Sequence, residues 1–329
     1  MTTRRSARDA RVRIRAGTGA AVALLLPAAM LACAGPPAPT TAPTTAETRD
    51  AEASGTFEPG GGDRSGLVDI GGSRELYLQC SGSGSPTVVL ISGAGVAADN
   101  WQYDDADPSE PSNSAVYPET ARFTRVCAYD RPGTQLWEGA AGRSTAVAQP
   151  TTTQADTADL HALLTAADVA GPYVVVGHSL GGLIATTFAR TYPDEVSGIV
   201  LIDPGSQYLQ TALPADVWTA WMQSVAEAAQ QNPDSESPDY PASITGLEAT
   251  PPLPSMPAVV FSADQPFDYL GIGDADAYWP NWLESHALLA ASLSATHITQ
   301  TNSGHFVANA SPALVVEQIC SIVMPAEGC

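Results

Sequence analysis

The pentapeptide GHSLG at residues 177–181 limits the possible folds of this chain more than any other feature. It follows residues 173–176, a short apolar run rich in β-branched side chains that is typical of a buried strand. It precedes residues 183–192, which predict a helix that ends before Pro193. A strand, a tight glycine turn and a helix hold the serine at the turn in a strained conformation that exposes its hydroxyl. Ser179 is therefore the predicted nucleophile.

The residues around this serine fit the same chemistry. Glycines two positions before and after Ser179 keep Cβ atoms out of the place where strand and helix cross. The first N–H groups of the following helix have no intrahelical partners and carry partial positive charge. They can stabilise the anion that forms when an acyl group is transferred to a serine.

A serine hydroxyl is a weak nucleophile until a positioned imidazole takes its proton. His305 lies between a predicted last strand, residues 296–301, and a predicted closing helix, residues 312–323. It is the predicted general base. For the other four histidines, a packed or solvated role is the better interpretation: His161, His178, His286 and His297.

Residues 171–203 resemble the α/β-hydrolase superfamily, in particular small bacterial serine hydrolases and esterases, and the similarity extends over most of residues 67–324. Two further segments carry it. Residues 92–95 (SGAG) stand where the family usually has His-Gly, and residues 129–133 (YDRPG) are similar to its Tyr-Asp-Arg-x-Gly segment. The resemblance implies an α/β fold with a mostly parallel central sheet, helices on both faces, and a small helical cap inserted after the strand ending at Asp203.

The same resemblance implies roles for further residues. The backbone N–H groups of Ala94 and Leu180 would form the oxyanion hole. The cap would span about residues 204–257 and contain one amphipathic helix followed by a polar loop, residues 230–243. Aromatic side chains such as Trp221 would line an acyl pocket or attach the cap to the body of the domain.

The acid that orients the histidine has more than one candidate. In this fold the chain order is serine, acid, histidine. The usual site follows a late strand, residues 257–263, where Asp264 stands, but Pro266 occupies the position of the acid in the common Gly-Asp-x-Asp pattern. Some members place the acid at the end of the strand after the elbow helix, where this chain has Asp203. We favour Asp203, with Asp264 as the alternative and Asp268 as a further candidate.

Residues 1–34 are predicted to be an export signal. Six arginines precede an apolar run, residues 20–32, that is too short to anchor stably across a bilayer. Residues 30–33 (MLAC) resemble a bacterial lipobox, in which Cys33 would be diacylated; an ordinary signal-peptidase site, ACA, is the alternative. We expect an exported protein, either a cell-surface lipoprotein or a freely secreted one, that meets the membrane only through an anchor at Cys33.

The rest of the chain divides into a linker and one domain. Residues 35–66 are rich in Pro, Thr, Ala, Gly and Glu and poor in large apolar side chains, which predicts a flexible linker. Residues 67–329 form the predicted hydrolase domain. No internal repeat is visible.

Five cysteines leave four for pairing if Cys33 carries lipid or is lost with the signal, and export places them in an oxidising compartment. The sheet order of the superfamily puts the strand of Cys127 beside the strand that ends at Cys80, which implies a Cys80–Cys127 disulfide. Cys320 and Cys329 lie nine positions apart in a stretch where Pro325 and Gly328 let the chain turn back, so we expect them to pair. Four buried free thiols are the alternative.

The net charge is −21, and about −26 once the six N-terminal arginines and Asp9 are removed. Such a charge argues against nucleic acid and anionic membrane surfaces as partners. The chain contains no lysine, which excludes a P-loop, a Schiff-base lysine and a Ser-Lys dyad. We expect no cofactor and no metal; residues 101–120 form an acidic insert that we interpret as a solvated surface loop, with a calcium site as a minor alternative.

These features favour an exported serine hydrolase that cleaves carboxylic esters through an acyl-enzyme intermediate, with a small-molecule ester and water as its partners. An aminopeptidase or amidase could use the same residues if the acidic loops supplied a pocket for a free amine. A catalytically silent binding protein on the cell surface is the alternative from another class. A serine nucleophile argues against dehalogenase and epoxide hydrolase chemistry, which use an aspartate in this fold.

Overall fold

The structure is a computed structural model, and it describes residues 62–268 and 275–326. The predicted export signal, its lipidation site at Cys33 and most of the predicted linker lie outside the described residues. Within the part that is described, no helix has the length and apolar character needed to cross a membrane.

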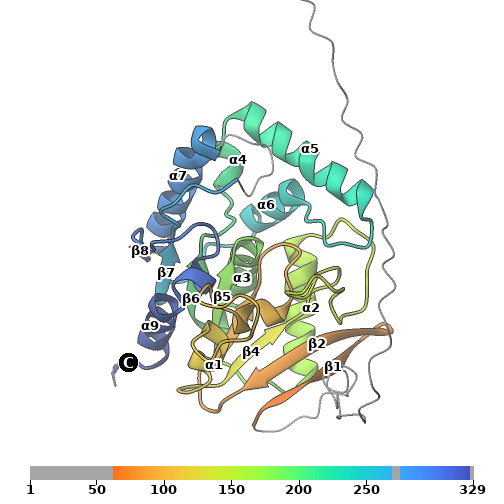
Figure 1. The fold of residues 1–329 in the computed structure, drawn as a ribbon, viewed down its shortest axis with the longest axis vertical. Helices are drawn as coiled ribbons and strands as arrows, with labels where there is room; N and C mark the ends of the chain where they lie inside the picture. The colour runs from red at the N-terminus through yellow and green to blue at the C-terminus, as the bar shows by residue number, and fades with distance from the viewer. Residues whose placement is uncertain (1–61, 269–274, 327–329) are drawn as a thin grey trace, which may run out of the picture. The chain divides into compact units, whose positions relative to one another are not determined.

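An eight-stranded sheet forms the centre of the domain, in the order β1-β2-β4-β3-β5-β6-β7-β8 (Figure 1). The first two strands form an antiparallel hairpin, and β2 also pairs antiparallel with β4. All other neighbouring strands are parallel. The mostly parallel sheet confirms the predicted fold class. The strands are β1 Arg64–Gly71, β2 Arg74–Ser81, β3 Thr87–Ile91, β4 Val126–Tyr129, β5 Tyr173–His178, β6 Val196–Ile202, β7 Ala258–Phe261 and β8 Thr296–Ile298.

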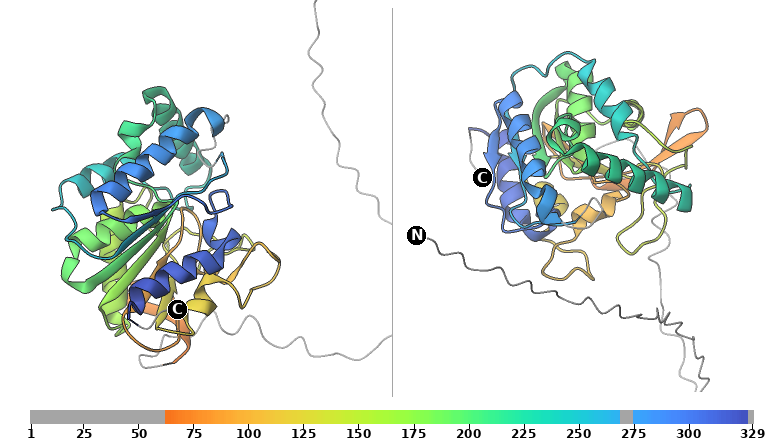
Figure 2. Two further views of the ribbon diagram at one scale, coloured as in Figure 1. Left: turned by 90° about the vertical axis from the view of Figure 1, so that its left-hand side faces the viewer. Right: turned by 90° about the horizontal axis from the view of Figure 1, so that it is seen from above.

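Helices cover both faces of this sheet (Figure 2). On one face α1 packs against α9, and on the other α2 packs against α3. Every residue of β3 and β5 is buried, which explains why their sequences are continuous apolar runs instead of alternating patterns. The helices outside the segment between β6 and β7 are α1 Val116–Thr120, α2 Thr153–Ala166, α3 Leu180–Thr191, α7 Ala275–Leu293, α8 Val307–Ala310 and α9 Pro312–Val323.

Residues 204–257, between β6 and β7, form an insertion with helices α4 Leu209–Ala212, α5 Ala215–Gln231 and α6 Tyr240–Glu248, drawn in green to blue-green at the top of Figure 1. Helix α5 is the amphipathic helix that the sequence predicts. The predicted polar loop at 230–243 is wrong in its last part, because α6 begins at Tyr240. The side chain of Asp239 caps this helix by accepting a hydrogen bond from the Ala242 N–H at 2.9 Å.

Cys80 and Cys127 lie opposite each other in the pairing of β2 with β4 and are joined by a disulfide bond. Both are fully buried. Cys320 is buried in α9, whereas Cys329 lies outside the described residues, so the pairing of these two cysteines stays a prediction.

The acidic insert at residues 101–120 is held by its own hydrogen bonds. The Asp104 carboxylate accepts from the Ala106 N–H at 3.0 Å and from the Ser112 hydroxyl. Its last residues form α1 and are not all at the surface as expected, since Val116 and Thr120 are buried. In residues 62–268 and 275–326, no group of three or more His, Cys, Asp or Glu side chains is placed so that it could hold a metal ion.

Candidate active site

Ser179 lies between the end of β5 and the start of α3, as the sequence predicts. Its backbone has φ 54° and ψ −121°, a conformation that costs a non-glycine residue about 1–3 kcal/mol. The turn is tight enough to require glycine at both flanking positions. A Cβ at Gly177 would lie 2.1 Å from the Gly181 oxygen, and a Cβ at Gly181 would lie 2.1 Å from the Ile91 oxygen.

Asp203 follows β6 directly and is fully buried. Its carboxylate accepts a hydrogen bond from His305 Nδ1 at 2.6 Å and another from the Ala263 N–H at 2.9 Å. Burial alone would raise the pKa of Asp203. The hydrogen bond from His305 and the electrostatic interactions with the His286 and His305 rings outweigh burial, so the pKa of Asp203 is lower than usual. Asp203 is therefore held as an anion against the imidazole.

The two other candidate acids have different partners. Asp264 accepts hydrogen bonds from the backbone N–H groups of Thr301, Asn302 and Ser303, at 2.9–3.1 Å. It fixes the loop that leads to His305 and does not contact the imidazole through these bonds. Asp268 accepts a hydrogen bond from the Tyr278 hydroxyl at 2.7 Å. The geometry thus brings the Asp203 carboxylate to the histidine ring.

The loop after β3 lies against the serine. A Cβ on Gly93 would be 3.3 Å from the Ser179 Cβ, so the backbone of this loop passes directly over the nucleophile. Ala94 and Leu180 both line the same pocket as Ser179. Leu180 is the first residue of α3, where a helix has no intrahelical acceptor for its N–H. Both residues predicted to supply the oxyanion donors therefore line the pocket that contains the serine.

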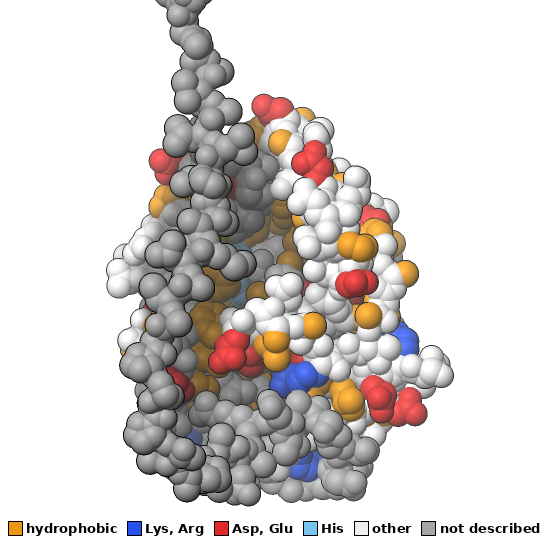
Figure 3. All heavy atoms as spheres, turned by 45° about the vertical axis from the view of Figure 1, so that its right-hand side comes forward, with side chains coloured by type: hydrophobic (Ala, Val, Ile, Leu, Met, Phe, Trp, Pro, Cys, Tyr) orange, Lys and Arg blue, Asp and Glu red, His pale blue; other side chains and the backbone are white. Residues whose placement is uncertain are grey.

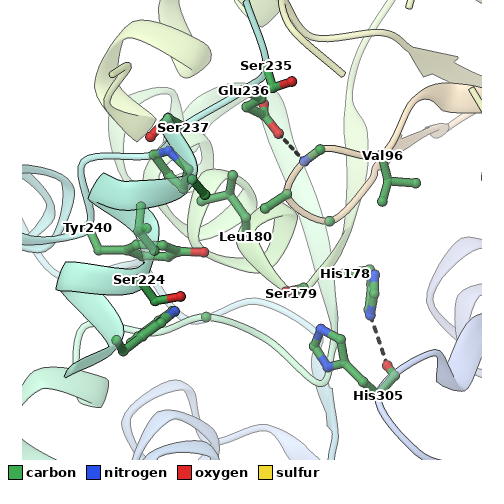
Figure 4. Close-up of a pocket in the computed structure, with 18 of the residues that line it drawn as sticks. Val96, His178, Ser179, Leu180, Ser224, Ser235, Glu236, Ser237, Tyr240 and His305 are labelled. Atoms are coloured by element: carbon green, nitrogen blue, oxygen red, sulfur yellow. Dashed lines mark hydrogen bonds between the residues drawn. The ribbon is translucent and has the colours of Figure 1, made fainter. Parts of the chain in front are cut away.

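A pocket of about 520 Å³ surrounds these residues. Figure 3 shows it as a hollow with hydrophobic side chains around it and a histidine inside. In Figure 4, Tyr240 and Ser224 of the insertion face Ser179 and His305 across the pocket. Most of the lining is apolar or aromatic, and it comes from the insertion, from α7 and from the loops after β7 and β8: Trp221, Val225, Tyr240, Phe267, Trp282 and Phe306.

Two histidines that the sequence assigned to packing touch this site. His178 is buried and bonded through Nε2 to the His305 carbonyl at 2.9 Å, and burial lowers its pKa to about 3, so it donates as a neutral ring. His286 is bonded through Nε2 to the Pro204 carbonyl at 3.0 Å, and its Nδ1 lies 3.6 Å from an Asp203 oxygen. Burial lowers the pKa of His286 to about 4. Both histidines are packed in the interior, as expected, and they lie against His305 and Asp203, which would perform the chemistry.

An ion pair between Arg131 and Glu236, which the sequence does not predict, also lies at this site. Arg131 follows β4, and Glu236 belongs to the loop between α5 and α6. Both side chains are 1% exposed, and Glu236 lines the pocket. The YDRPG segment marks the arginine, but no pattern in the insertion marks its partner.

Comparison with known protein families identifies the class of protein to which this fold and this site belong. The model of the alpha/beta hydrolase family matches residues 88–318. The chain therefore belongs to the alpha/beta hydrolase family.

The relatives of this chain include uncharacterized proteins. One from Schizosaccharomyces pombe is 33% identical over 147 residues, which is 40% of this chain and 26% of that protein. The chain thus spans about a quarter of that relative's length. YqjL of Bacillus subtilis, also uncharacterized, is 26% identical over 71% of this chain and 82% of its own length. Among solved structures, Est816, described as an N-acyl homoserine lactone degrading enzyme, has a TM-score of 0.53 at 17% identity, covering 78% of this chain and 100% of that one, which shows the shared fold.

Proposed function

We propose that this protein is a serine hydrolase that cleaves carboxylic esters through an acyl-enzyme intermediate, with Ser179, His305 and Asp203 as its triad. The observation that carries the proposal is the 2.6 Å bond from His305 Nδ1 to the buried Asp203 carboxylate, in a pocket that Ser179 also lines. Such a bond fixes the ring orientation and places the proton on Nδ1. Nε2 is then the ring nitrogen that can take the serine proton.

The proposed reaction has two halves. His305 removes the Ser179 proton while the hydroxyl oxygen attacks the ester carbonyl, and the N–H groups of Ala94 and Leu180 stabilise the resulting oxyanion. The imidazolium that forms is stabilised by Asp203 and gives its proton to the leaving alcohol. Water, activated by the same imidazole, then hydrolyses the acyl-serine and regenerates the enzyme.

The charge of the pocket favours an ester over the substrate of an aminopeptidase. Recognition of a free amine would require an uncommitted carboxylate in the pocket. Among the described lining residues, Glu236 is the one carboxylate, and it is bonded to Arg131 at 2.6 Å and 3.0 Å. The acidic insert at residues 101–120 contributes nothing to the described lining. An uncharged acyl chain fits the remaining apolar surface better than an ammonium group does.

The decisive experiment combines Ser179→Ala with a fluorophosphonate probe and a panel of ester and aminoacyl substrates. The wild-type protein should react with the probe and turn over esters faster than aminoacyl amides. Ser179→Ala should abolish labelling and lower turnover by at least about 10⁴-fold, since loss of a triad member costs orders of magnitude. Turnover within about tenfold of wild type in this variant, with the fold intact by circular dichroism, contradicts the proposal. No labelling of the wild-type protein would favour the silent binding protein.

Export is the second part of the proposal. Six arginines, an apolar run and the MLAC sequence support a lipoprotein signal, with Cys33 as the lipidated residue and residues 35–66 as a tether to the cell surface. Intact mass spectrometry of the mature protein tests this. We expect the mass of a chain that begins at Cys33 and carries a diacylglyceryl group. A mass without the diacylglyceryl group would indicate secretion without an anchor.

A further inference from the structure

A buried ion pair connects the insertion to the core of the domain. Arg131 Nε donates to one Glu236 carboxylate oxygen at 2.6 Å, and Nη2 donates to the other at 3.0 Å. The Glu236 N–H also donates to the Gly133 carbonyl at 2.8 Å, which holds the insertion loop against the YDRPG segment. Two parallel bonds between a guanidinium and a carboxylate fix relative orientation as well as charge.

The guanidinium also binds the loop that passes over Ser179. Arg131 Nη1 donates to the Ser92 carbonyl at 2.9 Å, and Nη2 donates to the Gly93 carbonyl at 2.7 Å. The Gly93 carbonyl and the Ala94 N–H belong to the same peptide unit, which is trans and planar, so the two groups point in opposite directions. The bond to the carbonyl therefore turns the Ala94 N–H away from the guanidinium.

Glu236 binds the other side of the same loop. The Gly95 N–H donates to its carboxylate at 2.6 Å, the contact drawn as a dashed line in Figure 4. The peptide that follows Ala94 is thus held by the carboxylate, and the peptide that precedes Ala94 is held by the guanidinium. The Ala94 N–H lies in the preceding peptide plane, which the guanidinium holds through the Gly93 carbonyl, and the carboxylate fixes the chain on the other side of Ala94.

We propose that Arg131 and Glu236 are positioning residues that aim the Ala94 N–H at the oxyanion, so that the oxyanion hole is complete only while the insertion is docked. The proposal rests on the serine hydrolase function proposed above. The cation on the Gly93 carbonyl also polarises this peptide, which strengthens its N–H as a hydrogen-bond donor. The insertion would then be part of the catalytic machinery as well as a wall of the pocket.

The first test is kinetic. Glu236→Gln keeps the size of the side chain but removes its charge, and we expect kcat to fall roughly 10- to 100-fold, with KM changed by less than about threefold. A donor that acts on the transition state contributes about 10²–10³ in rate, and here it is misaligned instead of lost. The matched control is Glu227→Gln, which removes an exposed carboxylate on α5 and should leave kcat unchanged.

A second variant separates positioning from folding. Replacement of a buried ion pair by apolar side chains of similar volume is often neutral for stability. The double variant Arg131→Met with Glu236→Leu should therefore keep the circular dichroism spectrum and cooperative melting of the wild type while its kcat stays roughly 100-fold lower. A folded double variant with kcat within about threefold of wild type would overturn the proposal.

The third measurement does not depend on turnover. In hydrogen exchange of the full chain, amides in a peptide covering residues 92–96 should exchange at least about tenfold faster in Glu236→Gln, with the β5 amides unchanged. Unchanged exchange in this loop overturns the proposal. If the wild-type protein shows no turnover that depends on Ser179, the proposed function has failed, and the exchange result still decides whether the ion pair holds the loop.

Discussion

Two buried pairs of ionisable side chains flank the serine, and they differ in what they connect. Figure 4 shows Ser179 between His305, of the first pair, and Glu236, of the second. Asp203 and His305 both follow strands of the sheet, whereas Glu236 comes from the insertion and reaches Arg131 behind β4. The partners are 102 positions apart in the first pair and 105 in the second, so distance along the chain does not distinguish them.

The difference lies in what fixes each partner. Carboxyl ends of parallel strands meet at one edge of a sheet, so two residues placed there are brought together by the fold itself. The insertion has no register with the sheet, and its loop is positioned by individual contacts such as the bond from Glu236 to Gly133. The first pair is therefore a consequence of the topology, and the second is a contact that this particular insertion makes.

The largest expected effect comes from a substitution that breaks the pair formed by Asp203 and His305. Asp203→Asn should lower kcat about 10³–10⁴-fold, because the amide cannot hold His305 in the correct tautomer or stabilise its charged form. Asp264→Asn is the matched control. It affects the loop at residues 301–303 and should cost less than about tenfold. Steady-state kinetics with a chromogenic ester measures both. Equal, mild losses in the two variants would show that Asp203 is not the acid.

This comparison also defines how much the sequence could reveal. The GHSLG turn, the order of strands and the strand end at Asp203 are local or topological features, and they predicted the sheet and the elbow. The direction of the Asp203 carboxylate is tertiary, which is why Asp264 and Asp268 remained candidates until the bond to His305 was seen. Glu236 could not be recognised, because a carboxylate in a polar loop is ordinarily solvated.

The start of α6 does have a local signal in the sequence. Asp239 precedes Tyr240-Pro241, and an aspartate followed by proline in the first turn is a standard beginning of a helix. The polar residues around it favoured a loop in the prediction. Here the local capping signal is more informative than the average composition of the segment.

An intermediate effect concerns the stability of the second pair. Glu236→Leu and Arg131→Met should each lower the free energy of unfolding by about 3–5 kcal/mol, since each leaves a buried charge without its partner. The double variant Arg131→Met with Glu236→Leu should lie within about 1 kcal/mol of wild type. Urea unfolding of the wild type, the two single variants and the double variant gives the four free energies of this double-mutant cycle. Additive losses would mean that the two side chains contribute independently and are not coupled as a pair.

The smallest expected effect concerns Asp156, a buried carboxyl on α2 that can be compared with the buried Asp203. Burial raises its pKa to about 7, and the charge of Glu236 adds to this rise. Asp203 is equally enclosed, but the hydrogen bond from His305 lowers its pKa. The two carboxyls therefore have opposite effects on the pH dependence of stability.

The direction in which Asp156 changes stability with pH follows from the number of protons that the folded and unfolded states bind. An unfolded aspartate has a pKa of about 3.9, so between about pH 4 and pH 7 the folded protein binds more protons at Asp156 than the unfolded chain does. This group's contribution to stability is therefore highest below about pH 4, falls as the pH rises towards 7, and stays low above it.

Asp156→Asn removes the loss of stability that ionisation of this carboxyl causes as the pH rises. Relative to wild type, the variant should gain about 3 kcal/mol of stability between pH 4.5 and pH 8. Urea unfolding of both proteins at the two pH values isolates the group, because the other titrations are common to both. A difference that does not change with pH would show that Asp156 is ionised in the folded protein and that its charge is compensated by Arg131.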